Sequence, residues 1–201
     1  MGKLFEHSCI IISLYRCSCV MNCLIYIAVV GKSTAMTMQC KYIKIGQGGK
    51  SMVVNTKVFG EIEVDEAKFL IFEDGILGFP DLKRFMLIHD EESSGNNVIS
   101  WMQSIDEPGF AMPVIDPLKV CPDYNPEVED ELLKSLGDFT GEDLLVLTTV
   151  TVPSEIERMT SNLKAPFIIN AQNLRACQII VEDDKYLIKY PIYEILKSNK
   201  E

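Results

Sequence analysis

Residues 144–152 read LLVLTTVTV, a run of nine with no charged side chain and with valine or threonine at six positions. β-Branched side chains favour extended backbone, and a continuously apolar run is typical of a strand that is buried on both faces. We therefore expect this run to be the central strand of a sheet and the rest of the domain to be organised around it.

Shorter strands are expected on both sides of this run. Residues 58–64, VFGEIEV, alternate apolar and polar side chains over Ile62 and Val64, which is the period of a half-buried strand. The same pattern, with turn-forming residues in the gaps, predicts strands at 68–72, 85–89, 98–102, 111–115, 167–170, 176–181 and 186–192. Pro191 cannot donate to a ladder, so the last strand belongs at an edge. These strands predict a mainly β fold, an antiparallel β-barrel-like or sandwich single domain with one or two short helices.

The clearest helical pattern is NPEVEDELLKSLG at residues 125–137. We expect Asn125 to be the N-cap, Pro126 to occupy the first helical position and Gly137 to follow the last turn. The apolar residues of this segment fall on one stripe: Val128, Leu132, Leu133 and Leu136. The stripe predicts a helix that lies on the sheet. A second, short helix is expected from Tyr193 onward.

The composition of the chain changes sharply near residue 52. Residues 1–51 hold five of the seven cysteines, six of the 19 basic residues and one of the 29 acidic residues. The remainder therefore holds 13 basic and 28 acidic residues, a net charge of −15. Such a break marks a boundary, and the second segment is long enough for one domain with a full core. We predict a leader at 1–51 and a β domain at 52–201.

Several interpretations of the leader are open. Its apolar run at 10–30 is interrupted by Arg16 and Asn22, which disfavours a transmembrane helix and a signal peptide. Its cysteines lack the paired spacing of a zinc site. Residues 48–50, GGK, require purine-rich codons just before the Met52 codon, where a bacterial ribosome-binding site belongs. We favour a start at Met52, so that the leader is translated upstream sequence, or disordered, and not part of the fold.

The domain contains few residues suited to catalysis. Its only histidine, His89, lies at the end of an expected strand, where a solvated role is the common one. No serine lies in a G-x-S-x-G motif, and the sequence has no glycine-rich phosphate-binding loop. Cys121 and Cys177 are far apart in sequence, and we expect each to be a small buried apolar residue. These observations predict a protein that is not an enzyme and uses no cofactor and no metal.

The acidic charge of residues 52–201 indicates which partners are favoured. A net charge of −15 repels phosphate, and the basic stripe typical of nucleic-acid-binding proteins is missing. An acidic surface instead suits a basic protein partner, because opposite charges steer the encounter. The charge therefore predicts protein binding without direct nucleic-acid contact.

Several strings in this segment resemble, in the same order, those of the flagellar assembly factor family, FliW. They are FGEIEV at 59–64, FEDGILGF at 72–79, QSIDEP at 103–108, IDP at 115–117, PDY at 122–124, VTVP at 150–153, TSNLKAPFIIN at 160–170 and QII at 178–180. The resemblance covers residues 53–192. It departs from the family pattern at Leu77, where the family usually has proline, and at Pro80, where it usually has an acid.

The resemblance implies a cytoplasmic, non-catalytic, β-barrel-like protein with two protein ligands and no membrane attachment. One ligand is flagellin, and the other is the carbon storage regulator CsrA, an RNA-binding repressor of flagellin translation. In the family scheme, flagellin occupies the factor while export is blocked. Once flagellin is secreted, the free factor binds CsrA and removes it from the flagellin message. The acidic charge fits this scheme, since it attracts a basic RNA-binding protein.

Candidate partner-binding residues are the polar and loop-borne members of these strings. Glu61 and Glu63 are expected to face outward on the first strand, opposite in direction to Ile62 and Val64. The other candidates flank turns or loops: Glu73 and Asp74 beside Gly75, Gln103 and Asp106 in the loop before Pro108, Asp123 and Tyr124 before the helix, and Asn162 and Asn170. For the two asparagines, hydrogen bonding to turn backbone is an equally good expectation.

Two other functional hypotheses are open at the level of sequence. The first is an exported or membrane-tethered β domain that uses the leader. The second is a hydrolase that uses His89 with a nearby acid.

Overall fold

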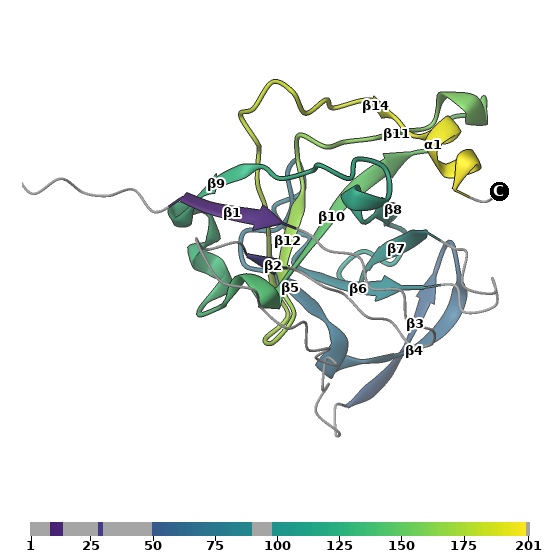
Figure 1. Ribbon diagram of the computed structural model, residues 1–201. Helices are drawn as coiled ribbons and strands as arrows, with labels where there is room; N and C mark the ends of the chain where they lie inside the picture. Colours follow the sequence, from purple (N-terminus) through teal and green to yellow (C-terminus); the bar gives the residue numbers. More distant parts are fainter. Residues whose placement is uncertain (1–8, 14–27, 30–49, 90–97, 200–201) are drawn as a thin grey trace, which may run out of the picture.

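The computed structural model describes residues 9–13, 28–29, 50–89 and 98–199. The described part of the chain is built around a nine-stranded sheet in the order β12-β13-β5-β6-β7-β8-β10-β11-β14 (Figure 1). The bounds are β5 Leu70–Phe72, β6 Arg84–Ile88, β7 Ile99–Ser104, β8 Ala111–Ile115, β10 Leu144–Thr151, β11 Thr160–Ser161, β12 Phe167–Asn170, β13 Arg175–Gln178 and β14 Tyr190–Pro191. Pairing is antiparallel except between β13 and β5.

β10 is the strand at which the sheet closes on itself. Its first half pairs with β12, from Leu144 opposite Asn170 to Leu147 opposite Phe167. Its second half pairs with β8 and then with β11. Because β12 and β10 lie at the two ends of a run of seven strands, their pairing turns that run into a ring. The barrel-like expectation is confirmed, and so is the buried central strand, since six of the eight residues of β10 are buried.

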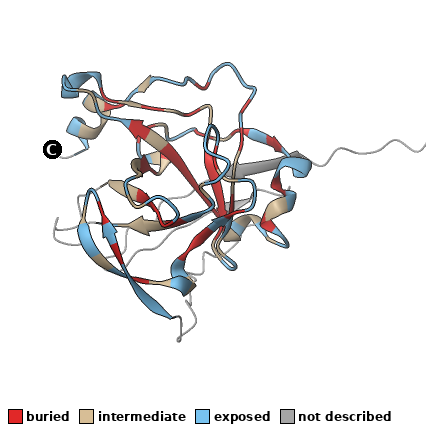
Figure 2. Cartoon of the chain, turned by 180° about the vertical axis from the view of Figure 1, so that it is seen from behind, coloured by how far each residue is buried: buried red, intermediate tan, exposed pale blue. Residues whose placement is uncertain are grey.

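Aromatic side chains fill the interior of this ring. Phe72 on β5 packs edge-to-face against Phe85 on β6, with ring centroids 5.3 Å apart, and against Phe167 on β12, at 5.8 Å. Edge-to-face pairs at these distances add about 0.5–1.5 kcal/mol each beyond the area that they bury. Buried residues recur along the strands of the ring and are densest on β10 and β12 (Figure 2).

A separate hairpin, β3 Ser51–Thr56 and β4 Gly60–Asp65, packs beside the ring (Figure 1). β3 is not among the strands expected from the sequence. Its inward residue Val54 and the β4 residue Val64 form a small core with Phe69 and Ile105. The chain turns at Gly60, where φ is 68°, a value that favours glycine. The hairpin is thus held by one apolar face and exposes the other.

The segment after Tyr124 corrects the expected helix. It forms strand β9, Glu127–Glu129, and then a 3-10 helix, Asp130–Leu136, that ends at Gly137 as expected. Asn125 is not the N-cap, because its backbone N–H donates to Tyr186 Oη at 2.8 Å, while Tyr124 Oη donates to the Leu163 carbonyl at 2.8 Å. These two hydrogen bonds keep the chain extended past Asn125, where the helix was expected to begin.

The 3-10 geometry also changes which side chains are buried. Val128, Leu133 and Leu136 are buried as expected, but Leu132 is 48% exposed. A 3-10 helix has three residues per turn, so Leu133 and Leu136 share a face and Leu132 points away from it.

Short helices complete the described chain. The further 3-10 helices are Glu66–Lys68, Pro117–Lys119, Gly141–Asp143 and Ile156–Arg158. The short C-terminal α-helix is confirmed as α1, Tyr193–Ser198. It follows Ile192, which packs in a second small core with Ile115, Val120, Val150 and Met159. Pro191 lies in β14 at the edge of the sheet, as expected.

Two short strands lie within residues 1–51. β1, Cys9–Ser13, pairs with β9 and with β2, Ala28–Val29. The proposed boundary at residue 52 stays a prediction. Within the described ranges, no helix has the length and hydropathy needed to cross a membrane.

Candidate protein-binding surface

The turn that follows β5 carries two exposed apolar residues, Leu77 and Phe79, next to the predicted acidic residues Glu73 and Asp74. Gly75 has φ 70°, and a Cβ there would lie 2.5 Å from the Pro80 carbonyl oxygen, so glycine is required. Ile76 is buried and anchors the turn, and its carbonyl accepts the Phe79 N–H at 2.8 Å. Leu77 and Phe79 are 50% and 47% exposed. The turn therefore presents two large apolar side chains on a fixed backbone.

Contacts with two other segments hold this turn in place. The Phe79 ring packs on the Phe110 ring, with centroids 4.9 Å apart. The Leu77 N–H donates to Gln178 Oε1 at 2.9 Å, and Gln178 Nε2 donates to the Ala165 carbonyl at 3.2 Å. Because the side chain of Gln178 is bonded at both ends, it ties the turn to the strands of the ring.

The loop before β8 is the second part of the surface, and Asp106 organises it. Its carboxylate accepts the backbone N–H groups of Lys83 and Arg84, at 2.8 and 2.7 Å, and the Arg84 Nε–H at 2.7 Å. Desolvation raises the pKa of Asp106, but the hydrogen bonds from Arg84 and Lys83 together lower it by more, so the pKa lies below its usual value. Asp106 therefore remains ionised and joins the loop to β6.

Gln103 has a structural position and not the loop position that we expected. It lies within β7 and is fully buried. Its Nε2 group donates to the carbonyls of Ser104, Pro108 and Phe110, at 2.8, 3.1 and 3.0 Å. The expectation of a loop residue is wrong, because this amide closes the loop from inside. Its side chain offers no surface to a partner.

The acidic residues Glu73 and Asp74 lie at the start of the same turn. Both are exposed, and Glu73 Oε1 forms an ion pair with Arg175 Nη1 at 3.0 Å. Asp74 has no ion pair within the described part of the chain. We call residues 73–82 and 104–110 together the turn–loop surface; its carboxylates belong to Glu73, Asp74, Asp81, Asp106 and Glu107.

The outward face of the hairpin meets this surface at the hairpin tip. Glu61 and Glu63 are exposed and alternate with Ile62 and Val64, as expected. The Lys57 N–H at the tip donates to the Pro108 carbonyl at 3.3 Å, and the Phe59 ring packs edge-to-face on Trp101 at 5.7 Å. The two glutamates thus extend the acidic character of the turn–loop surface along β4.

The remaining candidates lie elsewhere, and two of them are buried. Tyr124 is 1% exposed, and burial raises the pKa of its hydroxyl. Asn170 is fully buried, and its Nδ2 donates to the carbonyls of Leu136 and Asp138 at 3.0 and 3.1 Å. Asn162 Oδ1 accepts the Lys164 N–H at 3.1 Å, which is the turn role that we considered. Asp123 is exposed next to Tyr124. The structure does not bring these four residues onto the turn–loop surface.

The groups that could perform covalent chemistry are dispersed. His89 Nδ1 is hydrogen bonded to Ser100 Oγ at 2.8 Å, at an exposed strand end. Burial raises the pKa of both thiols, that of Cys177 to about 11, so both are protonated at neutral pH. Cys121 and Cys177 are half-buried, whereas full burial was expected for both. Within the described ranges, no group of three histidine, cysteine or acidic side chains could hold a metal ion.

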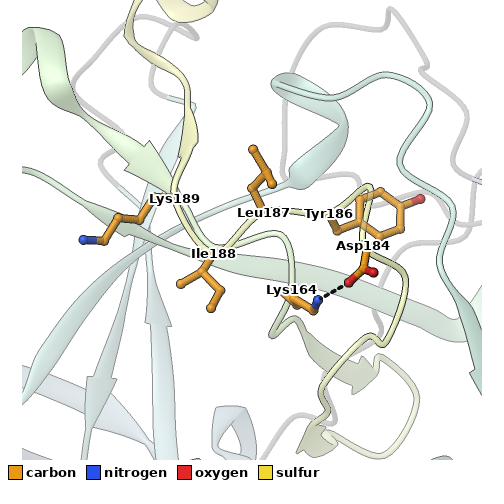
Figure 3. A pocket seen from close by; sticks show the side chains of 6 residues that line it. All are labelled: Lys164, Asp184, Tyr186, Leu187, Ile188 and Lys189. Carbon is orange, nitrogen blue, oxygen red and sulfur yellow. Dashed lines mark hydrogen bonds and ion pairs between the residues drawn. The ribbon is translucent and has the colours of Figure 1, made fainter.

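An open hollow lies on a different part of the molecule, beside the chain that leads to β14 (Figure 3). It is lined by Lys164, Asp184, Tyr186, Leu187, Ile188 and Lys189. Lys164 Nζ and Asp184 Oδ1 form an ion pair at 3.1 Å across it. The hollow contains none of the sequence-predicted site residues.

Sequence reasoning missed three kinds of residue at the turn–loop surface. Leu77 was noted only as a departure from the family pattern and Phe79 only as part of a string, and neither was expected to be exposed. Gln178 and Arg84 hold the surface through contacts between distant segments, which sequence does not reveal. Phe110 was not singled out, and its packing on Phe79 depends on the same long-range fold.

The fold and surface define a class of protein: a small β-barrel-like domain that presents an ordered acidic and apolar surface. A model of the family described as FliW protein matches residues 53–192. The chain belongs to the FliW family, and the resemblance drawn from the sequence is confirmed.

Relatives and a solved structure give the same result. The chain is 53% identical over 143 residues to the flagellar assembly factor FliW of Lachnoclostridium phytofermentans, a match that covers 71% of this chain and 92% of the relative. It is 48% identical over 147 residues to that of Caldanaerobacter subterraneus, covering 73% and 97%. A crystal structure of the flagellar assembly factor FliW matches with a TM-score of 0.65 and 27% identity, over 71% of this chain and 97% of that chain.

Proposed function

We propose that this protein is a cytoplasmic, non-catalytic flagellar assembly factor that binds flagellin and, when free of it, binds CsrA. Binding of CsrA relieves repression of flagellin mRNA translation. The family assignment supports the flagellar role, since its curated relatives are named flagellar assembly factors. The turn–loop surface supports the mode of action, because it combines fixed acidic groups with exposed Leu77 and Phe79.

This surface has the composition of a protein-binding site. Aromatic and other large apolar residues that are exposed on a rigid backbone act as anchors, and charges around them set the encounter rate and the choice of partner. Asp74, Asp81 and Glu107 have no ion pair within the described part of the chain, so their charge is available to a partner. A basic RNA-binding protein matches this charge.

The same charge keeps the protein away from RNA. A net charge of −15 over residues 52–201 opposes contact with phosphate, so the protein acts on the regulator and not on the message. Antagonism then needs no catalytic step, since occupying the regulator is sufficient. Of the ten residues named from the sequence, we keep Glu61, Glu63, Glu73, Asp74 and Asp106 as candidate contacts, together with exposed Asp123.

Calorimetric titration of the full chain with purified CsrA and with purified flagellin tests the proposal. We expect both to bind, and we expect Asp74→Lys and Leu77→Ala to weaken binding of CsrA at least tenfold. Glu157→Lys is the matched control, because Glu157 is an exposed acid on the 3-10 helix Ile156–Arg158, outside the turn–loop surface. Failure of both proteins to bind the unmodified chain would contradict the proposal.

We also propose that the functional domain begins at Met52. The family match that starts at residue 53 supports this boundary. N-terminal sequencing of the protein from its native cells tests it: a product that starts at Met52 or Val53 is expected, and a mature product that retains residues 1–51 contradicts it.

A further inference from the structure

The hairpin β3–β4 has two outer edges that differ in chemistry. It forms a sheet of its own, and in the described part of the chain neither outer edge has a strand neighbour. Its six pairs run from Ser51 opposite Asp65 to Thr56 opposite Gly60. An unpaired edge presents a row of backbone N–H and C=O groups that can accept another strand. Both edges are long enough for this, because strands of three to ten residues are usual.

The β4 edge is protected by charged residues against pairing with another strand, and the β3 edge is not. β4 carries three carboxylates, Glu61, Glu63 and Asp65. β3 reads SMVVNT, with no charge and no proline, and three of its six residues are β-branched, which favours extended backbone. Charged residues and proline are the usual means of blocking edge pairing, so β3 is the open edge.

The side chains along β3 leave room for an added strand. Val53 is 60% exposed on the outward face, where it lies opposite Glu63. Met52 is 37% exposed on the inward face, whose other members, Val54 and Thr56, are buried. An added strand would cover Met52 with its inward side chains and Val53 with its outward ones. Both contacts remove apolar surface from water.

The charge of β4 determines which strand fits. On the outward face, an added strand would lie two strand spacings, about 10 Å, from Glu61 and Glu63. That distance is about one Debye length at 0.1 M salt, so the two carboxylates still favour a positive charge there. The inward positions favour apolar side chains, because they meet Met52.

We propose that β3 is a strand-addition site for an extended segment of a partner protein in which basic and apolar residues alternate. The inference goes beyond the proposed function, which names partners but no mode of contact, and it rests on that function only in taking proteins as ligands. A second copy of the chain is disfavoured, because two domains that each carry −15 repel one another.

The test uses the isotope-labelled full chain and a capped eight-residue peptide of alternating valine and lysine, followed by amide exchange in NMR. Backbone groups in an antiparallel pair point alternately toward and away from the partner strand. We therefore expect the peptide to slow exchange at every second amide of β3, residues 51, 53 and 55 or residues 52, 54 and 56, and to leave the outer amides of β4 unchanged. A peptide of alternating valine and glutamate should bind at least tenfold more weakly.

A pair of variants checks the position of the added strand. Val53→Lys places a positive charge beside the incoming lysines and should abolish protection, whereas Val53→Thr keeps an uncharged β-branched residue and should retain it. Absence of alternate protection on β3, equal binding of the two peptides, or pairing of β3 with a second copy of the chain would each overturn the inference. Binding of CsrA and flagellin is measured separately and decides the proposed function alone.

Discussion

Asp106→Asn should make the stability of this protein less dependent on pH. In the folded protein the Asp106 carboxylate accepts three hydrogen bonds, two from backbone N–H groups and one from Arg84 Nε. Its side chain is 20% exposed, whereas that of Arg84 is 51% exposed. The backbone bonds therefore contribute most, because half-exposed ion pairs contribute only about 0–1 kcal/mol.

The expected loss follows from these contacts. Hydrogen bonds to a charged acceptor contribute roughly 1.5–3 kcal/mol each. Asparagine keeps one acceptor oxygen and places an NH₂ group where the second oxygen accepted a bond. We expect the free energy of unfolding at pH 7 to fall by about 2 kcal/mol, equivalent to one such bond.

The direction of the pH dependence follows from the lowered pKa of Asp106. A carboxyl group whose folded pKa is below its unfolded value stabilises the fold above the unfolded pKa, about 3.9, and this contribution is lost as pH falls through the folded pKa. The difference between the native sequence and Asp106→Asn should thus be complete at pH 7 and should shrink below about pH 4.

Urea unfolding measures this difference, with the single tryptophan, Trp101, as the fluorescent probe. Asp81→Asn is the matched control, because Asp81 is an exposed acid on the same surface with no ion pair within the described residues. The control should change the free energy of unfolding by less than about 0.5 kcal/mol. A loss at Asp106 that is equally small, or that stays constant down to pH 3, would show that the ionised carboxylate does not stabilise the fold.

Gly75→Ala should destabilise the fold by more than about 2 kcal/mol, because the added Cβ meets the Pro80 carbonyl at 2.5 Å and the backbone has φ 70°; urea unfolding that matches the native sequence would contradict this. Cys177 should react with iodoacetamide at pH 8 at least tenfold more slowly than in the unfolded chain, since its pKa is raised to about 11, and mass spectrometry of the peptides should show this difference. His89→Ala should leave binding of CsrA and flagellin unchanged in calorimetry, and a loss of either would show that His89 takes part in binding. Raising salt from 50 to 300 mM should slow association with CsrA in stopped-flow measurements, and a constant rate would argue against electrostatic steering.

Local patterns in the sequence were sufficient to predict most of the fold. The uncharged, β-branched run at Leu144–Thr151 is the strand that closes the ring. The strands at Ala111–Ile115 and Phe167–Asn170 were also predicted from local patterns, and helix α1 lies where a short helix was expected. Local patterning succeeded for these strands because burial determines both the pattern and the structure.

Errors arose where distant contacts decide the local structure. A helix was expected from Asn125, but hydrogen bonds to Tyr186 and Leu163, far along the chain, hold that region extended. Gln103 looked like a loop residue, yet its amide is buried against three carbonyls. The acids Glu61, Glu63 and Asp74 were correctly expected to be exposed, whereas the apolar part of the surface, Leu77 and Phe79, was recognised only in the structure.

The most direct test of the account is a three-component competition. CsrA is bound to a fluorescent RNA that carries its site from flagellin mRNA, and the full chain is added while RNA anisotropy is recorded. We predict that the chain lowers the anisotropy by removing CsrA from the RNA, and that subsequent addition of flagellin restores it. An anisotropy that does not respond to the chain, or that flagellin does not restore, would contradict the claim that this protein acts by exchanging one protein partner for another.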